Sequence, residues 1–240
     1  MAPAASLTHN LEGGYRFLAA PGRPFSGGIV ADPGLGVVRA RFERPLALEQ
    51  GLAAASEHVE TAGRPVKAIA GIELRIPQAL TQAEFDSFNK RYVSLLETFG
   101  LRVNGLIPAA RTNVAPIDGG VSEPSVYAFC YSFPERLDRP SFVLSGIPET
   151  EPGTPSAMLD SIIRTASGRL EELGVSWEQA TATYVYAAAG VVSQILDTPQ
   201  LLAGNGGLRG VHWFPSHPPV QGLQLEVDVR STFREVVIQS

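Results

Sequence analysis

Two similar stretches decide how this chain is organised: PFSGGIVADPG at residues 24–34 and FVLSGIPETEPG at residues 142–153. Each is interpreted as a strand with a Ser-Gly pair. Each is followed by a helical stretch, a β-rich stretch, a second helical stretch and an arginine ahead of another strand. A repeat of this size indicates two copies of one small unit. The sequence therefore predicts two units, at residues 12–133 and 134–240, and leaves open whether they share the last strand of the first. Any functional site is expected within one copy or between the two.

Hydrophobic periodicity predicts four helices, at residues 46–61, 81–99, 156–173 and 190–202. Thr81 and Glu84 form the pattern of a capping box, and Ser156 is the expected cap of the third helix. Strands are expected at 15–19, 25–30, 36–42, 66–76, 111–117, 125–133, 141–147, 180–188, 209–214, 222–229 and 232–238, after a loose leader up to about residue 11. This order is typical of an α+β fold with helices on one sheet face.

Composition narrows the classes of partner. The chain has 240 residues, a net charge of −5 and no run of lysine or arginine, which argues against a nucleic-acid partner. No stretch approaches the roughly 20 apolar residues that span a bilayer, and the first ten residues lack the features of a signal peptide. We expect a cytoplasmic protein. The single cysteine, Cys130, lies in an apolar run, where it is interpreted as core filler in preference to a nucleophile.

The motifs around these strands resemble a tandem duplication in the RidA/YjgF (L-PSP endoribonuclease-like) superfamily. Residues 26–36, SGGIVADPGLG, match its Ser-Gly-x-Ile-Pro-x-Asp-Pro-x-x-Gly motif, and residues 108–111, PAAR, match its Pro-Ala-Arg motif with one extra alanine. In the second copy, residues 145–148 (SGIP) and 223–227 (LQLEV) match. Arg209 falls where that family has its arginine, although the preceding Pro-Ala is missing.

The resemblance implies a fold, an assembly and a chemistry. Each unit would be a chorismate-mutase-like, six-stranded mixed sheet backed by two helices, and the chain would form a homotrimer. Its ligand would be a small carboxylate-bearing metabolite, handled without metal or organic cofactor. The substrate-binding residues that the resemblance implies are Arg209, Ser26, Gly27, Ser145, Gly146 and Tyr131.

Arg111 and Glu226 are the candidate catalytic residues. A guanidinium is always charged and grips a carboxylate through two parallel hydrogen bonds, so Arg111 suits an acidic substrate, although an ordinary surface ion pair is the alternative. Glu226 and Asp228 alternate with apolar residues and share one strand face. That face is either solvated, or it buries a carboxyl group with a raised pKa that works as an acid or base. The family's water-positioning glutamate aligns with Gln224, and the strand at 125–133 has no acid.

His212 and His217 flank Trp213-Phe214-Pro215. Two histidines five residues apart, without a further ligand, make no metal motif, so they are interpreted as pocket lining or core, with His212 as a possible substrate contact.

The predicted function is hydrolysis of a small enamine, imine or amino-muconate-like carboxylate with release of ammonia. The alternatives left open are a chorismatase- or cyclic-amide-type hydrolase and a metabolite-binding protein without catalysis.

Overall fold

The computed structural model of the chain describes residues 6–19, 24–150, 153–188, 190–195 and 209–239. The strands are β1 (Ser6–Asn10), β2 (Tyr15–Ala19), β3 (Ser26–Ala31), β4 (Leu35–Ala47), β5 (Ile69–Arg75), β6 (Ala110–Pro116), β7 (Ser125–Pro134), β8 (Phe142–Pro148), β9 (Ala182–Ala187), β10 (Val211–His217), β11 (Leu225–Ser231) and β12 (Arg234–Ile238). The helices are α1 (Leu48–Thr61), α2 (Gln82–Thr98), α3 (Pro155–Leu173) and α4 (Val192–Ile195).

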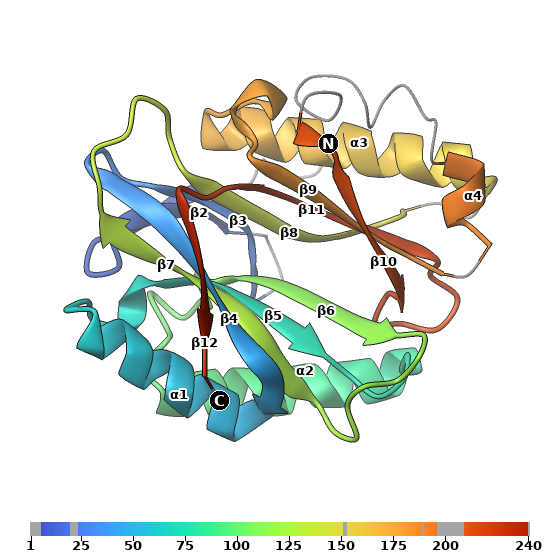
Figure 1. Cartoon of the computed structure of the whole chain (residues 1–240), viewed down its shortest axis with the longest axis horizontal. Helices are drawn as coiled ribbons and strands as arrows, with labels where there is room; N and C mark the ends of the chain where they lie inside the picture. The colour runs from blue at the N-terminus through green and yellow to red at the C-terminus, as the bar shows by residue number, and fades with distance from the viewer. Residues whose placement is uncertain (1–5, 20–23, 151–152, 189, 196–208, 240) are drawn as a thin grey trace.

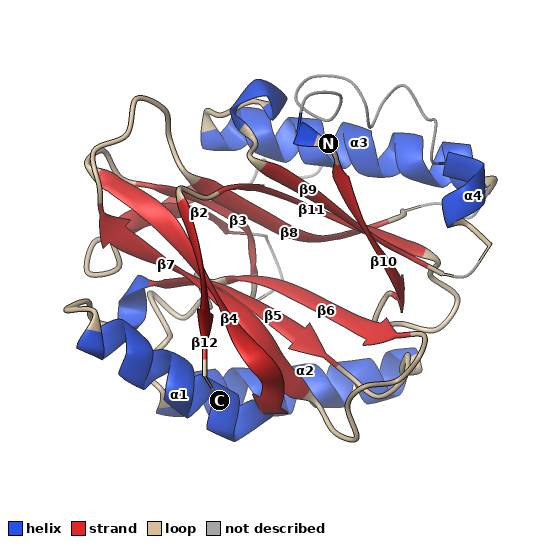
Figure 2. Ribbon diagram, viewed as in Figure 1, coloured by secondary structure: helices blue, strands red, loops and turns tan. Residues whose placement is uncertain are grey.

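These strands form one mixed sheet of twelve, in the order β1-β2-β3-β8-β11-β9-β10-β6-β5-β7-β4-β12. The sheet bends so that its two halves face each other, with α1 and α2 outside one half and α3 outside the other (Figures 1 and 2). Each helix buries one apolar stripe against its half: Leu52, Ala55 and Val59 in α1, and Leu159, Ile162 and Leu170 in α3. The space between the halves is therefore an interior layer lined by strands.

The prediction of two six-stranded sheets is wrong, because the two halves of the chain exchange strands. β3, from the first predicted unit, pairs antiparallel with β8 of the second. β12, from the end of the chain, pairs in parallel with β4 through Arg234↔Val38 to Ile238↔Phe42. The sheet continues from one half to the other at Ser216↔Pro116 and His217↔Ala115, where β10 meets β6. Whether residues 12–133 and 134–240 form separate units stays a prediction, because strand pairing crosses that boundary.

The helix ends follow local chemistry. Thr81 and Glu84 form the predicted capping box of α2, with Glu84 N–H donating to Thr81 Oγ1 at 3.3 Å. The predicted cap of α3 is wrong: Thr154 caps that helix, and Pro155 occupies the first turn, where its missing N–H costs nothing. Most of the helix predicted at 190–202 lies outside the described residues, which show only the short α4.

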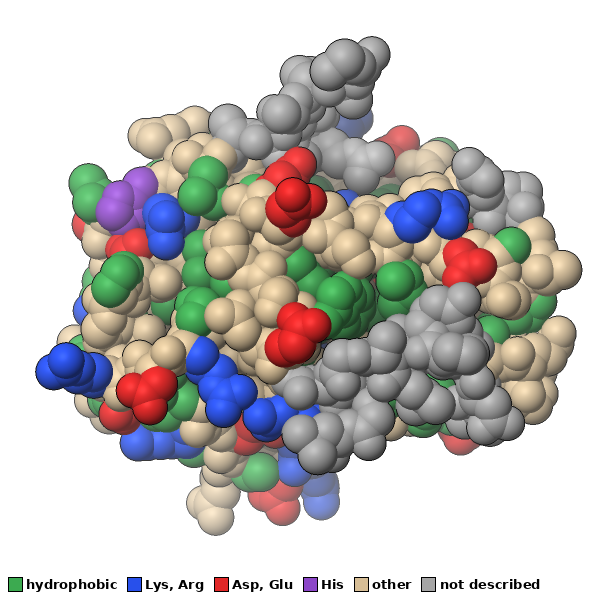
Figure 3. Space-filling model, turned by 90° about the horizontal axis from the view of Figure 1, so that it is seen from above, with side chains coloured by type: hydrophobic (Ala, Val, Ile, Leu, Met, Phe, Trp, Pro, Cys, Tyr) green, Lys and Arg blue, Asp and Glu red, His purple; other side chains and the backbone are tan. Residues whose placement is uncertain are grey.

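Two further features bear on the sequence-based expectations. The predicted leader contains a strand, β1, which pairs with β2 from Ser6↔Ala19 to Asn10↔Tyr15. Among the helices described, none combines the length and apolar character needed to cross a membrane. On the face that carries α3, acidic and basic side chains are interspersed (Figure 3).

Candidate active site

Two strands bring charged side chains into the interior layer. β5 (IAGIELR) places Glu73 and Arg75 on one face, and β11 (LEVDVRS) places Glu226, Asp228 and Arg230 on one face. Both strands are buried along their whole length. Because they belong to facing halves of the sheet, acids and bases from distant parts of the sequence meet there. The solvated strand face considered as an alternative for Glu226 and Asp228 is therefore wrong.

Glu73 is held by two arginines. Arg39 Nε and Nη2 donate to its two carboxylate oxygens at 2.7 and 2.9 Å, and Arg230 Nη1 donates to Oε1. Burial alone would raise the pKa of Glu73, but the charges of Arg230 and Arg39 outweigh burial and hold that pKa well below its usual range. Glu73 is therefore ionised in the folded protein.

Asp228 completes what we name the central charge cluster: Arg39, Glu73, Asp228 and Arg230. Its Oδ2 accepts from Arg230 Nη2 at 2.6 Å and from Thr112 Oγ1 at 2.5 Å, and its Oδ1 accepts from the backbone N–H of Gly146 at 2.8 Å. Two guanidiniums thus face two buried carboxylates, and Arg39 Nη1 also donates to the half-exposed Glu235 at 3.3 Å. The cluster ties β4, β5 and β6 of one half to β8 and β11 of the other.

Glu226 lies beside this cluster, but its carboxyl group differs from those of Glu73 and Asp228 in its hydrogen bonding. Its side chain is buried, the residue being 3% exposed, and Oε1 has no hydrogen-bond partner among the residues that the structure describes. Burial, followed by the charge of Asp228, raises the pKa of Glu226 well above its usual range, while the charges of Arg111 and Arg75 and the backbone of Asn113 act in the opposite direction. Glu226 is therefore a buried acid that keeps its proton more readily than an ordinary glutamate.

Arg111 extends from β6, and aromatic rings surround its guanidinium. Its guanidinium carbon lies 4.2 Å from the ring centre of Phe25, 5.2 Å from that of Tyr92 and 5.5 Å from that of Phe85. Nη1 donates to Asn89 Oδ1 at 2.8 Å. In the described residues no carboxylate forms an ion pair with it, so the guanidinium keeps donors for an anion. Burial lowers the pKa of Arg111, with Tyr92 and Glu226 acting against that shift.

Asn113 is two residues along β6, on the same strand face as Arg111. Its amide nitrogen and oxygen are both buried, and neither has a hydrogen-bond partner in the described part of the chain. Orphaned buried groups of this kind are rare in folded proteins and call for an explanation. An amide that can both donate and accept, on the strand that carries Arg111 and beside a carboxyl group whose pKa is raised, can bind a small polar molecule or a water.

The two predicted Ser-Gly pairs reach this region differently. Ser26 turns onto its own strand, where Oγ donates to the Gly28 oxygen at 2.8 Å, and the Gly27 oxygen accepts from Arg169 at 3.4 Å. Ser145 is buried, and Gly146 packs directly on β6. A Cβ on Gly146 would lie 2.5 Å from the backbone oxygen of Arg111. Gly146 therefore permits the close approach of β8 to β6.

Three other predicted residues lie in other surroundings. The Tyr131 hydroxyl contacts His58 Nε2 of α1 at 3.3 Å. Arg209 is exposed just ahead of β10, unlike the largely enclosed Arg111. His212 is also exposed and stacks on Tyr184 with ring centres 4.9 Å apart. Gly146 thus packs against the backbone of Arg111, and the charge of Arg111 acts on Glu226. Within the described part of the chain, Tyr131, Arg209 and His212 form no hydrogen bond with any of these residues.

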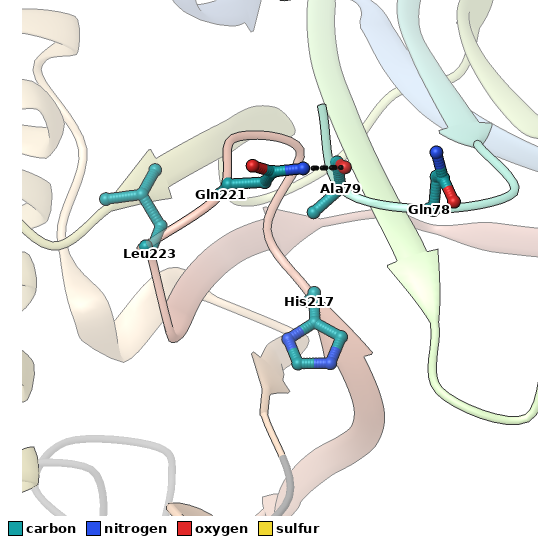
Figure 4. A pocket seen from close by; sticks show the side chains of 6 residues that line it. Gln78, Ala79, His217, Gln221 and Leu223 are labelled. Carbon is teal, nitrogen blue, oxygen red and sulfur yellow. Dashed lines mark hydrogen bonds between the residues drawn. The ribbon is translucent and has the colours of Figure 1, made fainter. Parts of the chain in front are cut away.

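His217 lines a surface pocket of about 370 Å³, together with Gln78, Ala79, Gln221, Gly222 and Leu223 (Figure 4). The two loops around the pocket are joined by a hydrogen bond of 3.2 Å from Gln221 Nε2 to the Ala79 oxygen. The pocket lies at the start of the strand that carries Glu226. Among the described residues, no group of three or more His, Cys, Asp or Glu side chains could hold a metal ion.

Sequence reasoning missed five polar members of the interior: Arg39, Glu73, Arg75, Asn113 and Arg230. The available signal was the alternation of acids and bases with apolar residues in IELR and LEVDVR. Two such strands, whose side chains carry opposite charges, indicate that the charged faces are buried against each other. Each strand alone is also compatible with a solvated face.

Comparison with known proteins identifies relatives of this chain. A family model described as 2-aminomuconate deaminase CnbZ matches residues 7–167 and 156–236. A 2-amino-5-chloromuconate deaminase from Comamonas testosteroni is 34% identical over 245 residues, which cover 94% of this chain and 96% of that protein.

Solved structures were also found. A chorismatase crystal structure is 13% identical, with a TM-score of 0.49, and the match covers 94% of this chain and 78% of that one. A cyanuric acid hydrolase is 10% identical, with a TM-score of 0.42, and the match covers 85% and 69%.

These relatives correct one prediction and confirm another. Assignment to the RidA/YjgF superfamily is wrong, because the motifs on which it depended are too short to separate one family from another. The prediction of an enzyme of the deaminase type is confirmed. With a family model that covers most of its length and a deaminase 34% identical to it, the chain belongs to the 2-aminomuconate deaminase CnbZ family.

Proposed function

We propose that this enzyme hydrolyses a small amino-muconate-like substrate, in which an enamine or imine carbon is next to a carboxylate, and releases ammonia. One observation carries the proposal: Glu226 is a buried carboxyl group whose Oε1 has no hydrogen-bond partner among the described residues, and the charge of Arg111 acts on it. The names of the family and of the Comamonas relative support the substrate class.

In the proposed reaction, Arg111 holds the carboxylate next to the amino-bearing carbon. Glu226 donates its proton to the neighbouring carbon of the enamine, and the double bond moves to give an iminium. Water then adds to the iminium carbon while the Glu226 carboxylate takes a proton from that water. Glu226 returns this proton to the nitrogen, ammonia leaves, and the hydroxyl proton goes back to Glu226 as the carbonyl forms. Overall, the enamine and one water molecule give a keto acid and ammonia.

The surroundings suit these steps. An enamine carbon is a weak base, so protonating it needs an acid that is still protonated near neutrality. Burial raises the pKa of Glu226 well above its usual range and so favours the protonated form. The positive charge of Arg111 and the aromatic rings around it enclose the carboxylate end, where a guanidinium interacts more strongly than in water. The proposed role of Asn113 is to orient the attacking water with its unpartnered amide.

The test measures ammonia release from 2-aminomuconate by the wild-type enzyme and by Glu226→Gln and Arg111→Gln. We expect Glu226→Gln to lower kcat by about 10²- to 10⁴-fold, because proton transfer is lost while the shape of the side chain is kept. Arg111→Gln should mainly raise KM. Glu43→Gln, at an exposed position of β4, is the matched control and should behave as wild type. Wild-type rates in Glu226→Gln would remove Glu226 from the reaction.

The homotrimer and the cytoplasmic location remain part of this proposal. The trimer was expected because a single unit leaves one sheet face uncovered. Within this chain, the two halves of the sheet already cover each other's inner face, so that reason no longer applies.

A further inference from the structure

Asp228 contacts the surroundings of Arg111 at two points. Its Oδ2 accepts from Thr112 Oγ1 at 2.5 Å, and Thr112 follows Arg111 directly on β6. Its Oδ1 accepts from the backbone N–H of Gly146 at 2.8 Å. Gly146 is the residue of β8 that packs on the backbone oxygen of Arg111. The carboxylate of Asp228 therefore joins β11 to β6 and β8 at the point where these two strands meet beside Arg111.

The contact with Gly146 depends on a β-bulge. The register between β11 and β8 shifts by one residue between Val227 and Val229. Asp228 therefore lies opposite two residues, Ser145 and Gly146. A bulge of this kind takes one residue out of the regular ladder and often contains a glycine with positive φ, and the φ of Gly146 is +67°. The N–H of that glycine is bound by the side chain of Asp228.

Asp228 is also a neighbour of the proposed catalytic acid. Glu226 and Asp228 are two residues apart on one face of β11, which places their Cα atoms roughly 7 Å apart. Both residues are buried. One side chain thus connects the two groups to which the proposed function assigns carboxylate binding and proton transfer.

We propose that Asp228 is a positioning residue of the active site, which fixes Arg111 relative to Glu226 and places a negative charge beside the Glu226 carboxyl group. Its hydrogen bonds to Thr112 and Gly146 supply the first effect. This inference rests on the proposed function for the roles of Arg111 and Glu226. Asp228 itself neither touches the substrate nor moves a proton.

The charge of Asp228 acts on Glu226 together with other groups. After burial, it is the largest influence that raises the pKa of Glu226, and the charges of Arg111 and Arg75 lower that pKa. Removing the charge of Asp228 leaves the arginines to favour the ionised carboxylate, so the pKa of Glu226 should fall. The other titratable and charged groups on the strands around Glu226 are Arg230 on β11, Glu73 on β5, Tyr184 and Tyr186 on β9, and Glu149 directly after β8.

The first experiment removes one hydrogen bond and keeps every charge. Thr112→Val deletes the hydroxyl that donates to Asp228 with little change in side-chain shape, and Thr112→Ser keeps that hydroxyl. We expect kcat/KM for 2-aminomuconate to fall by about 10-fold or more in Thr112→Val, because small displacements of a binding group cost rate. Thr112→Ser should stay close to wild type.

The second experiment measures kcat against pH, because a merely structural defect lowers kcat at every pH without displacing the profile. In the wild type, kcat should fall on the alkaline side as Glu226 loses its proton. In Asp228→Asn this fall should occur at a pH lower by about one unit, since the neighbouring like charge is gone. Glu235→Gln is the matched control. It removes a carboxylate that accepts from Arg39 and Tyr184, and it should leave the profile in place.

A third measurement follows the proton of Glu226 without catalysis. The free energy of unfolding of the wild type, relative to that of Glu226→Gln, should decrease above pH 4.5 until Glu226 is ionised in the folded protein. When both proteins also carry Asp228→Asn, this decrease should end at a lower pH.

The outcomes separate this inference from the proposed function. Equal kcat/KM in Thr112→Val and Thr112→Ser overturns the inference, and this pair decides if Asp228→Asn does not fold. A kcat profile that stays in place in Asp228→Asn also overturns it. If the wild type releases no ammonia but the decrease in stability ends at a lower pH with Asp228→Asn, the proposed reaction fails and the effect of Asp228 on Glu226 stands. If Glu226→Gln abolishes ammonia release while Asp228→Asn and Thr112→Val behave as wild type, the reaction stands and the positioning role fails.

Discussion

Two glutamates in the same interior have opposite acid–base behaviour, and the difference lies in their neighbours. Glu73 accepts hydrogen bonds from two guanidiniums, whereas Glu226 faces the charge of Asp228 and has an unpartnered oxygen. The pKa of Glu73 is therefore lowered, which favours its ionised form, and the pKa of Glu226 is raised, which favours its protonated form. The folded protein uses one carboxyl group to join its halves and keeps the other in a state suited to proton transfer.

This contrast predicts stability changes of opposite sign in Glu226→Gln and Glu73→Gln. The folded-state pKa of Glu226 is raised above 4.5, its ordinary value, so its contribution to stability is complete below that value and is lost as pH rises towards the raised pKa. Glu226→Gln should therefore gain stability relative to wild type by up to about 1.4 kcal/mol per pH unit over that window. Urea unfolding at several pH values measures the difference in the free energy of unfolding between the variant and the wild type. A difference that does not change with pH would contradict the prediction.

Glu73→Gln should lower the free energy of unfolding relative to wild type. Its folded-state pKa is lowered, so its contribution is present above its ordinary pKa of 4.5 and is lost as pH falls. At neutral pH the variant leaves Arg39 with only the half-exposed Glu235 as a counter-ion and Arg230 with only Asp228, which costs about 3–5 kcal/mol. The same unfolding series should show this deficit shrinking in acid.

At the scale of the elements, the close packing of β8 on β6 depends on Gly146. Its φ is +67°, and an added Cβ would lie 2.5 Å from the Arg111 backbone oxygen. Gly174 has a similar φ of +71° at the end of α3, and apart from its chain neighbours no described residue has a heavy atom within 4 Å of the position of a Cβ. Gly174→Ala should cost about 1 kcal/mol from the left-handed backbone alone. Gly146→Ala should cost a further 1–3 kcal/mol, about as much as overpacking a core, and also reduce kcat/KM.

Denaturant unfolding and ammonia release measured on both variants test this expectation. Equal losses of stability, with activity retained in both, would show that the β8–β6 approach does not position Arg111.

The elements themselves could be predicted from the sequence to a large extent, and their pairing could not. Residues 15–19 and 125–133 are the strands β2 and β7, give or take one residue, and the helix at 156–173 is α3 to within one residue. These elements follow from the local hydrophobic periodicity and from the glycines and prolines that end each element. That β12 would join β4, or that Arg111 would meet Glu226, depends on contacts between residues far apart in the chain. The repeat suggested two closed units because nothing local in the motifs indicates strand exchange.

For the molecule as a whole, the exchange of strands predicts a single unfolding transition. β3 is paired with β8, β12 is paired with β4, and the central charge cluster joins the same two halves. Neither half can unfold without breaking a strand pair and leaving buried charges of the other half unpaired.

Both tryptophans, Trp177 and Trp213, lie in the later half of the chain, while α1 and α2 lie in the earlier half. We expect tryptophan fluorescence and far-ultraviolet circular dichroism to melt at the same temperature, with equal calorimetric and van't Hoff enthalpies. A fluorescence transition that precedes the loss of helix would instead mean that the two halves unfold independently despite their shared strands.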